Sequence, residues 1–229
     1  QMRLISLLAI VLSISRAYTQ DSIHIRFVPK MLDENLLLEK AYFLNNDTIT
    51  VSNLKFYISN LAAYNADSLV FELDKKHHLF DLSQVKTHHL TEKLPSNVRF
   101  DKIGFYVGVD SLTNVSGAIA GDLDPTNGMY WTWQSGYINF KLEGSATSCP
   151  SRLHRFQWHI GGYQSPVNTL KQIHLKLEQK KDVDIQVQIG DLLSKFDLST
   201  TFQIMSPNRQ AVEIANTLPE IFKASVDAE

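Results

Sequence analysis

Histidine, tryptophan and cysteine are the residue types in this chain that could bind a transition metal or carry redox chemistry. The sequence has eight histidines, three tryptophans and one cysteine. Imidazole and thiolate are common ligands of copper. The chain contains neither His-x-x-x-His nor Cys-x-x-Cys, so no spacing along it is specific for a metal. A metal site would have to be assembled by the fold from residues far apart in sequence.

The histidines differ in what their surroundings predict. His77-His78 and His88-His89 are adjacent pairs, and adjacent side chains on a strand point to opposite faces, so neither pair chelates one ion without a special turn. We expect both pairs in surface loops. His159 is the stronger candidate for a ligand, because it lies near the end of a strand just before Gly161-Gly162, where a backbone can approach a ligand closely.

Two of the tryptophans form a Trp-x-Trp pair, Trp131 and Trp133. In an extended chain both indoles lie on one face, about 6.5–7 Å apart. The plainer interpretation of the pair is that it fills the core, because buried aromatic side chains usually serve packing. Trp158 belongs to a different strand and is expected in the core.

The remaining reactive residues point away from catalysis. Cys149 is the only cysteine, so the chain has no internal disulfide. Its thiolate could bind Cu(I), but its loop-like setting favours an incidental surface or half-buried thiol. Asp122 and Asp124 are most simply turn residues that cap backbone N–H groups. A hydrolase using Asp110 or Asp124 is the least favoured interpretation, and we expect that the protein is not an enzyme.

The elements that must position these residues are mostly strands. Turn residues separate segments in which apolar and polar residues alternate, which is typical of half-buried strands. These segments are 22–28, 48–59, 98–109, 137–143, 152–160, 172–178 and 182–189. The pattern predicts an all-β fold, an antiparallel β-sandwich. Within 48–59 the alternation slips by one residue, which predicts a β-bulge near Ser52-Asn53.

Connections and a C-terminal helical segment complete the predicted fold. Two hairpins are expected, closed by Asp74-Lys75-Lys76 and by Gln179-Lys180-Lys181. The polar segment 87–97 is expected to be a loop. Ser206 is the expected N-cap of a C-terminal helix, because serine caps well and a proline follows at the first helical position. Pro219 is expected to kink or divide this helix.

The N-terminal segment and the composition together predict one exported globular domain. Met2-Arg3 and the apolar run 4–14 resemble a cleavable signal peptide, and the run is too short to span a bilayer. We therefore expect a leader over 1–20, a single domain over 21–229, and a periplasmic or secreted location without a membrane span. The net charge of -2 offers no basic patch for a nucleic acid.

The segment 121–144 carries the most specific pattern in the chain, GDLDPTNGMYWTWQSGYINFKLEG. This pattern resembles the MbnP-like family, whose members are periplasmic copper-binding proteins associated with methanobactin gene clusters. The matching elements within it are LDP, GMYWTW, SGY and KLEG. Weaker matches at 55–60 (KFYISN), 105–110 (FYVGVD) and 159–162 (HIGG) extend the resemblance over most of the chain after residue 22.

The resemblance implies a function that the pattern of residues alone does not. In this family copper is held by histidines together with kynurenine, an oxidised tryptophan that a di-haem partner enzyme of the MbnH type produces. By resemblance, Trp131 or Trp133 is the oxidised residue, and His159 is one copper ligand. The family's second histidine has no clear counterpart here, and His24 is our candidate for it. The chain would be the substrate of this oxidation and not its catalyst.

A binding module without a metal is the alternative function. An exported β-sandwich whose exposed aromatic side chains contact a glycan or a protein surface would use Trp and Tyr residues equally well. The two functions differ in measurable properties, because only the first requires copper and a tryptophan of altered mass.

Overall fold

The computed structural model describes residues 22–95, 98–133, 136–177 and 182–225. The expected leader over 1–20 and the expected turn Gln179-Lys180-Lys181 lie outside these ranges. Among the described residues, no helix has the length and apolar character needed to cross a membrane.

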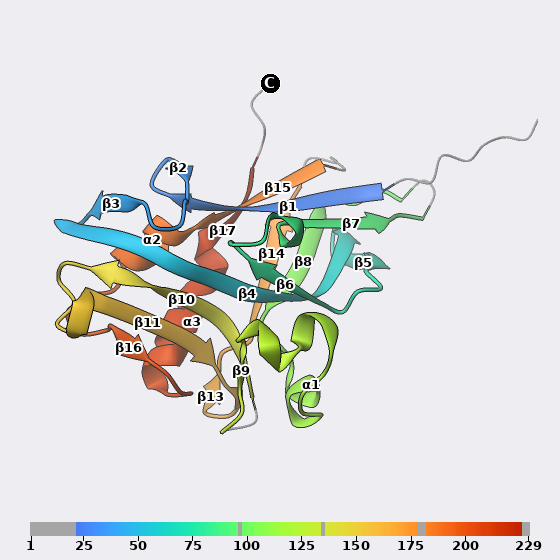
Figure 1. The fold of residues 1–229 in the computed structure, drawn as a ribbon. Helices are drawn as coiled ribbons and strands as arrows, with labels where there is room; N and C mark the ends of the chain where they lie inside the picture. Colours follow the sequence, from blue (N-terminus) through green and yellow to red (C-terminus); the bar gives the residue numbers. More distant parts are fainter. Residues whose placement is uncertain (1–21, 96–97, 134–135, 178–181, 226–229) are drawn as a thin grey trace, which may run out of the picture.

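Two β-sheets face each other around the main core (Figure 1). Within the described residues the larger sheet has ten strands, in the order β14-β8-β4-β10-β11-β16, with β3, β5 and β6 also paired to β4 and β9 to β10. These strands are β3 (Ala41–Leu44), β4 (Asp47–Asn65), β5 (Ser68–Glu72), β6 (His77–Asp81), β8 (Lys102–Val107), β9 (Tyr130–Trp131), β10 (Gly136–Ala146), β11 (Arg155–Gly161), β14 (Lys171–Lys176) and β16 (Gln203–Ile204).

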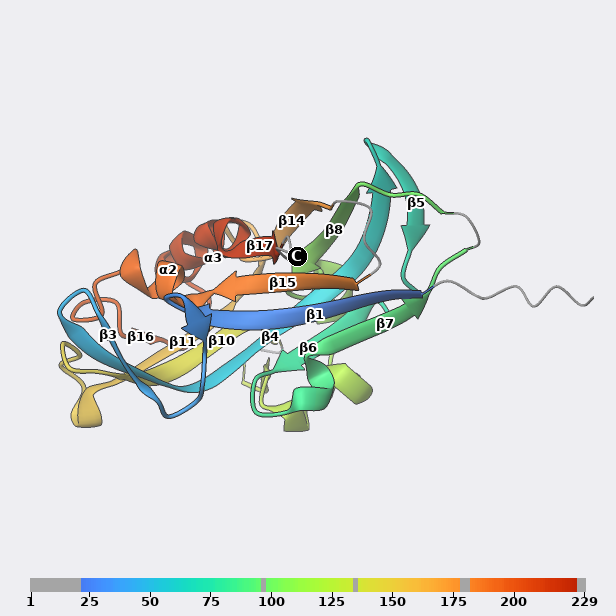
Figure 2. The same cartoon turned by 90° about the horizontal axis from the view of Figure 1, so that it is seen from above.

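The smaller sheet has five strands in the described part of the chain, in the order β17-β15-β1-β2 with β7 also paired to β1. They are β1 (Ser22–Met31), β2 (Glu34–Asn35), β7 (His89–Lys93), β15 (Asp182–Gln188) and β17 (Phe222–Ser225). Figure 2 shows β1 with β15 along one edge and β7 along the other, in front of the larger sheet. A separate two-stranded ribbon joins β12 (Tyr163–Gln164) to β13 (Val167–Asn168).

Aromatic side chains connect the two sheets. Phe27 of β1 meets Phe56, Phe80 and Phe105 of the larger sheet edge-on, with ring centroids 6.0–6.4 Å apart. Edge-to-face contacts of this kind add to the free energy gained from burying the rings. Trp158 is fully buried in the same core, as expected.

The predicted fold class is confirmed: the protein is a mainly β sandwich with helical segments toward the C-terminus. The predicted bulge is confirmed as well, because Glu143 of β10 pairs with Asn53 while Gly144 pairs with Val51, which leaves Ser52 as the extra residue of β4. Two pairings in the described part of the chain depart from a purely antiparallel arrangement, since β1 runs parallel to β15 and β11 runs parallel to β16.

Both expected hairpins are wrong. β14 pairs with β8 in the larger sheet, whereas β15 pairs with β1 and β17 in the smaller one, so the chain crosses between sheets at that point. β5 and β6 each pair with β4 and not with each other. The segment 87–97 is also not a simple loop, because it contains β7, which lies antiparallel to β1.

The described residues form three α-helices and four short 3-10 turns. They are α1 (Ser111–Val115), α2 (Ile189–Ser194) and α3 (Arg209–Ile221), with the short 3-10 turns η1 (Val85–Thr87), η2 (Gly121–Leu123), η3 (Pro125–Asn127) and η4 (Arg152–His154). Figure 2 shows α2 and α3 grouped at one end of the molecule. The N-cap of α3 is Asn208, which accepts a hydrogen bond from Ala211 N, and not Ser206. Pro219 falls in the last turn and does not divide the helix.

Candidate functional site

A polar strip runs across the outer face of the larger sheet, on the side away from the main core. Lys141 of β10 pairs directly with His159 of β11 and with Lys55 of β4. Residues paired directly across strands project to the same face. Their neighbours Leu54, Leu142 and Trp158 face the core, so the strip consists of residues that alternate with core residues.

His159 and Glu143 form the closest polar contact of this strip. The imidazole Nε2 lies 2.6 Å from Glu143 Oε1, and the other carboxylate oxygen accepts a hydrogen bond from Asn53 Nδ2 at 2.9 Å. His159 is only 6% exposed. Because an ionised carboxylate can only accept, Nε2 carries the proton and Nδ1 of a neutral ring keeps its lone pair. A histidine fixed by a carboxylate in this way is typical of metal ligands.

The charge state of Glu143 follows from the same contacts. The hydrogen bond from His159 is the largest influence, and with the Asn53 hydrogen bond and the nearby Lys141 ammonium it lowers the pKa of Glu143 to about 2 against the opposing effect of burial. Glu143 is therefore an anion at any physiological pH. It is a fixed acceptor that orients His159.

Acid is expected to destabilise the protein through Glu143. Folding lowers the pKa of Glu143 from 4.5 to about 2. Between these two pH values the folded state binds fewer protons than the unfolded state, so the stabilisation from this carboxylate is lost as the pH falls from 4.5 to about 2. We expect the free energy of unfolding of the natural protein to fall by roughly 2 kcal/mol more than that of Glu143→Gln between about pH 5 and pH 2. Urea unfolding across this range measures the difference, and equal losses in both proteins would contradict it.

Trp131 lies on the same face of the larger sheet as this histidine. Its ring packs on Gly161, where a Cβ atom would come within 2.7 Å of Trp131 Cζ3. Gly161 follows His159 by two residues on β11, so the two positions share a face and lie about 6.5–7 Å apart. Trp131 is 6% exposed, and its buried Nε1 has no hydrogen-bond partner. The close backbone approach predicted at Gly161 is thus made by this indole.

Trp133 connects Trp131 to the surface. The two ring centroids are 6.0 Å apart with the planes tilted by 48°, and Trp133 is 65% exposed. The Trp-x-Trp spacing in the sequence predicted that these two indoles would be neighbours. The pair does not fill the main core, however, because Trp131 belongs to a smaller cluster of buried residues with Tyr57, Met129 and Tyr137.

Two lysines hold the loop that leads to Trp131. Lys55 Nζ donates to Asn127 O at 3.1 Å, and Lys141 Nζ donates to Gly128 O at 3.0 Å. Gly128 has a φ of 72°, which a glycine adopts without strain. The loop is therefore anchored on the polar strip immediately before β9 begins, and this anchoring positions the indole.

The two aspartates of this loop have structural roles, as the sequence predicted. Asp124 caps η3 by accepting from Thr126 N at 2.8 Å. Asp122 accepts from Leu79 N at 2.8 Å and forms an ion pair with Lys75 at 2.8 Å, which fastens the loop to β6. Burial opposes ionisation of Asp122, but its contacts with Lys75 and Leu79 outweigh this effect and lower its pKa. The hydrogen bonds from Thr126 lower the pKa of Asp124. Neither carboxylate therefore has the raised pKa of a general acid.

The other candidate histidine, His24, lies on β1 in the smaller sheet, is exposed, and has Nδ1 3.0 Å from Thr91 Oγ1. His159 lies on the outer face of the larger sheet, so the two side chains belong to different sheets. Within the described residues, no group of three or more His, Cys, Asp or Glu side chains is close enough to hold a metal ion. Of the two candidate histidines, only His159 therefore shares a sheet face with Trp131.

Three of the four adjacent histidines, His77, His78 and His88, are less exposed than expected, whereas His89 is exposed. His77 and His78 lie on β6 and not in a surface loop, and the imidazole Nε2 of His78 is 2.6 Å from Thr87 O. His88 stacks on Phe80 with ring centroids 4.8 Å apart. These contacts give His78 and His88 structural roles, in hydrogen bonding and in aromatic packing.

Cys149 is buried and not on the surface. Its Sγ donates to Leu198 O at 3.3 Å, and burial raises its pKa to about 11. Since the thiolate is the reactive form, we expect Cys149 to resist iodoacetamide at pH 8 in the folded protein and to react in urea. Mass spectrometry after a timed exposure measures this. Rapid labelling of the folded protein would show that the thiol is accessible.

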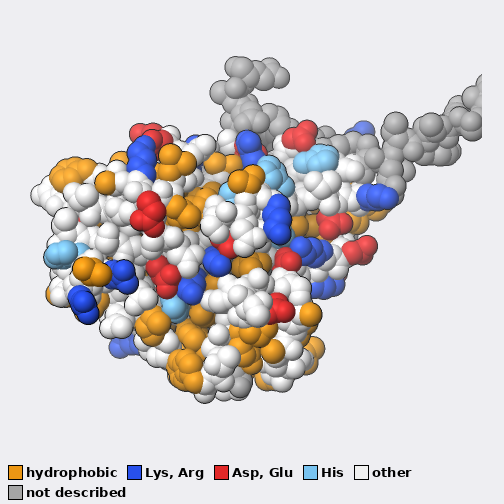
Figure 3. Space-filling model, in the orientation of Figure 1, with side chains coloured by type: hydrophobic (Ala, Val, Ile, Leu, Met, Phe, Trp, Pro, Cys, Tyr) orange, Lys and Arg blue, Asp and Glu red, His pale blue; other side chains and the backbone are white. Residues whose placement is uncertain are grey.

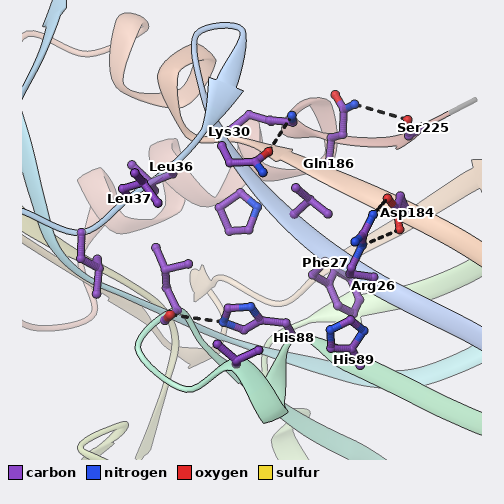
Figure 4. A pocket seen from close by; sticks show the side chains of 16 residues that line it. Arg26, Phe27, Lys30, Leu36, Leu37, His88, His89, Asp184, Gln186 and Ser225 are labelled. Carbon is purple, nitrogen blue, oxygen red and sulfur yellow. Dashed lines mark hydrogen bonds and ion pairs between the residues drawn. The ribbon is translucent and has the colours of Figure 1, made fainter. Parts of the chain in front are cut away.

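A large cavity lies elsewhere, on the smaller sheet. It measures about 750 Å³ and is lined in part by Arg26, Lys30, Leu36, His88 and Asp184 (Figure 4). A smaller hollow of about 350 Å³ adjoins the tryptophan site and is lined by Trp131, Tyr137, Tyr163 and Pro207 among others. The smaller hollow reaches Trp131, whereas the larger cavity reaches the His88-His89 pair.

A sequence model of the MbnP family matches residues 20–210. The chain belongs to the MbnP family. This confirms the resemblance found in the segment 121–144. The fold is similar to that of MbnP from Methylosinus trichosporium, with a TM-score of 0.63 and 12% identity over 91% of this chain and 99% of that one. At this identity the likeness shows the fold alone. No curated protein matches the chain.

Proposed function

We propose that this MbnP-family protein is an exported copper-binding protein in which Trp131 is oxidised to a kynurenine-type residue by a di-haem partner enzyme. The observation that carries the proposal is the position of Trp131, buried against Gly161 and on the same face as His159. Family membership supports it. In this proposal the chain is acted upon and is not an enzyme.

The residues present fit a copper site in part. His159 offers an imidazole nitrogen, and Glu143 orients the ring from the other side. An intact indole has only an N–H donor and no lone pair for a metal. Opening the indole ring creates an aromatic amine and a carbonyl, so Trp131 becomes a second donor only after oxidation. His24 takes no part in this site.

Trp133 has a separate role in the proposal. Converting tryptophan to N-formylkynurenine breaks the C2–C3 bond of the indole, and when water supplies both oxygens the step releases four electrons and four protons. Hydrolysis then removes formate. The four electrons leave Trp131 through the exposed ring of Trp133, 6.0 Å away, and pass through the haems to two molecules of hydrogen peroxide, which take up the four protons and become water. A buried tryptophan would otherwise have no contact with an external oxidant.

Mass and metal content test the proposal. Protein from a host that expresses the partner is expected to carry a tryptophan about 4 Da heavier at Trp131 and one equivalent of copper. The same protein from a strain without the partner is expected to have unmodified tryptophans and little copper. Unmodified tryptophans without copper in the presence of the active partner would refute the proposal.

The exposure of Trp133 also favours the alternative of a glycan- or protein-binding module. An exposed indole suits such contacts. This function requires neither the altered mass nor the metal, so the same experiment separates the two.

A further inference from the structure

The cavity of about 750 Å³ on the smaller sheet lies at a gap along one edge of β1. β15 occupies the other edge, and β7 and β2 share this one. The pairing with β7 ends where Arg26 meets His89, and the pairing with β2 begins where Lys30 meets Asn35. Between these two positions β1 has no strand partner on this edge in the described part of the chain. Figure 3 shows hydrophobic side chains and histidines next to each other on this part of the surface, below β1 in the view of Figure 1.

The gap is not an open strand edge that awaits a further strand. Phe27 N donates to His88 O at 2.9 Å immediately before β7, and Pro29 O accepts from Leu36 N at 2.9 Å immediately after β2. Proline has no N–H group to donate to an added strand. The backbone of β1 therefore offers little to a peptide, and the side chains decide what the cavity can bind.

Two loops form walls of the cavity, and hydrogen bonds fix both of them. Leu37 belongs to the connection between β2 and β3, where its N–H donates to the hydroxyl of Tyr42 at 2.8 Å. Val85 belongs to η1, in the connection between β6 and β7. The buried carboxylate of Asp81 holds this second connection by accepting from Ser83 N at 2.9 Å. Walls that are already ordered reduce the entropy lost when a ligand binds.

The walls present apolar side chains that the core does not cover. Leu37 and Val85 are 56% and 70% exposed, although both line the cavity. Leu36, which also lines it, is 3% exposed and belongs to the main core. A ligand that covers Leu37 and Val85 removes apolar surface from water, which favours binding.

The charged side chains of the cavity lie away from the leucines. Figure 4 shows Arg26 and Asp184 across the cavity from Leu36 and Leu37. Arg26 Nε donates to Asp184 Oδ1 at 2.8 Å, and the two side chains form an ion pair. Their charges cancel, so this pair gives the cavity no net charge.

Lys30 supplies the remaining fixed charge among the described residues that line the cavity. Its Nζ donates to Asn35 Oδ1 at 2.8 Å, which occupies one of the three N–H groups of an ammonium. His88 Nε2 lies 3.2 Å from Leu82 O and donates to its own wall. His88 and His89 are the other titratable lining residues, and each adds positive charge when protonated. The polar group that fits this cavity is therefore an anion.

We propose that this cavity binds a small carboxylic acid with an apolar body. The carboxylate lies at Lys30, where charge-assisted hydrogen bonds are stronger than bonds between neutral groups, and the body covers Leu37 and Val85. A volume of about 750 Å³ suits a small molecule. The cavity lies on the smaller sheet, whereas Trp131 and His159 lie on the larger one. The proposal therefore does not rest on copper binding or on tryptophan oxidation.

Titration calorimetry with octanoate tests this site, with the full folded chain and no added copper. We expect one octanoate to bind per chain. 1-Octanol has the same body without a charge, and octylammonium has the opposite charge, so each is expected to bind at least about tenfold more weakly. Absence of octanoate binding up to about 1 mM, or equally tight binding of 1-octanol, would overturn the proposal.

Two substitutions locate the ligand in the cavity. Lys30→Gln removes the charge and is expected to weaken octanoate binding by about tenfold, with 1-octanol binding unchanged. Leu37→Ser is expected to weaken the binding of both compounds by about fivefold. Leu69→Ser, a change of an equally exposed leucine on β5 (57%), is the control and is expected to alter neither. Unchanged octanoate affinity in Lys30→Gln would refute the position of the carboxylate.

Methyl resonances of the natural protein provide a measurement that does not depend on any variant. On titration with octanoate we expect the methyl signals of Leu37 and Val85 to shift and those of Leu69 to stay in place. Shifts at Leu69 without shifts at Leu37 and Val85 would show that octanoate binds elsewhere and would refute the cavity as its site. The copper content of the protein is measured separately, so failure of this site and failure of the proposed function are distinguishable.

Discussion

Replacing Trp131 by phenylalanine is expected to abolish both the mass increase and the copper. Phenylalanine fills much of the space against Gly161 but has no pyrrole ring to open, so no amine can form beside His159. We expect tryptic peptides of Trp131→Phe from the natural host to show unmodified Trp133 and Trp158, and copper to fall well below one equivalent. Peptide mass spectrometry and elemental analysis measure both.

Trp133→Phe is the matched control for this substitution. It keeps Trp131 but replaces the exposed indole by a phenyl ring, which gives up an electron less readily, so oxidation is expected to slow, with Trp131 still the residue modified. A mass increase at Trp133 in the Trp131→Phe protein, together with full copper, would reverse the assignment of the two residues. Thermal unfolding of both variants checks that any loss does not come from an unfolded chain.

Replacing Gly144 by alanine is expected to be the most destabilising small change in the larger sheet. A Cβ atom at Gly144 would lie 2.0 Å from Thr50 O, a backbone atom of β4, and 2.8 Å from Phe156 Cζ. A backbone carbonyl cannot rotate away as a side chain can, so the central strands must separate. We expect a loss of about 3 kcal/mol in the free energy of unfolding.

Urea unfolding measures this loss, with Ser145→Ala as the control. Ser145 is the next residue on the same strand and is half-buried, and its replacement adds no atom. We expect this control to change stability by less than about 0.5 kcal/mol. A loss below about 1 kcal/mol for Gly144→Ala would show that β4 and β10 tolerate a wider separation at the bulge.

Much of the fold was predictable from the alternation of apolar and polar residues, because a strand with one face in the core has an apolar residue at every second position. The bulge at Ser52 was found in this way, since an extra residue shifts the apolar positions by one. β7 was missed because only Leu90 of its five residues is buried, and one apolar residue makes no pattern. The hairpin predicted between β14 and β15 was wrong, because a short polar connection serves a hairpin and a crossing between sheets equally well.

The site was predictable only in part. The tryptophan pair and His159 were chosen as candidates mainly from the family resemblance, and His159 also from the glycines that follow it. The contact of His159 with Glu143 was not, because it depends on the register between β10 and β11. Lys55 and Lys141 were missed for a related reason, since their alternation with core residues is that of any outward-facing position. Gly161 was the useful signal, because a glycine inside a strand marks a close approach.

The parallel pairing of β1 with β15 has a consequence for how the chain reaches its native state. β1 is among the first parts of the domain to be synthesised, yet its partner over residues 182–188 is among the last. β7 can cover one edge of β1 early, but the other edge stays open until most of the chain exists. Contacts of such long sequence separation make folding slow. The nascent chain therefore carries an unpaired strand edge for most of its synthesis, which invites aggregation unless a chaperone binds it.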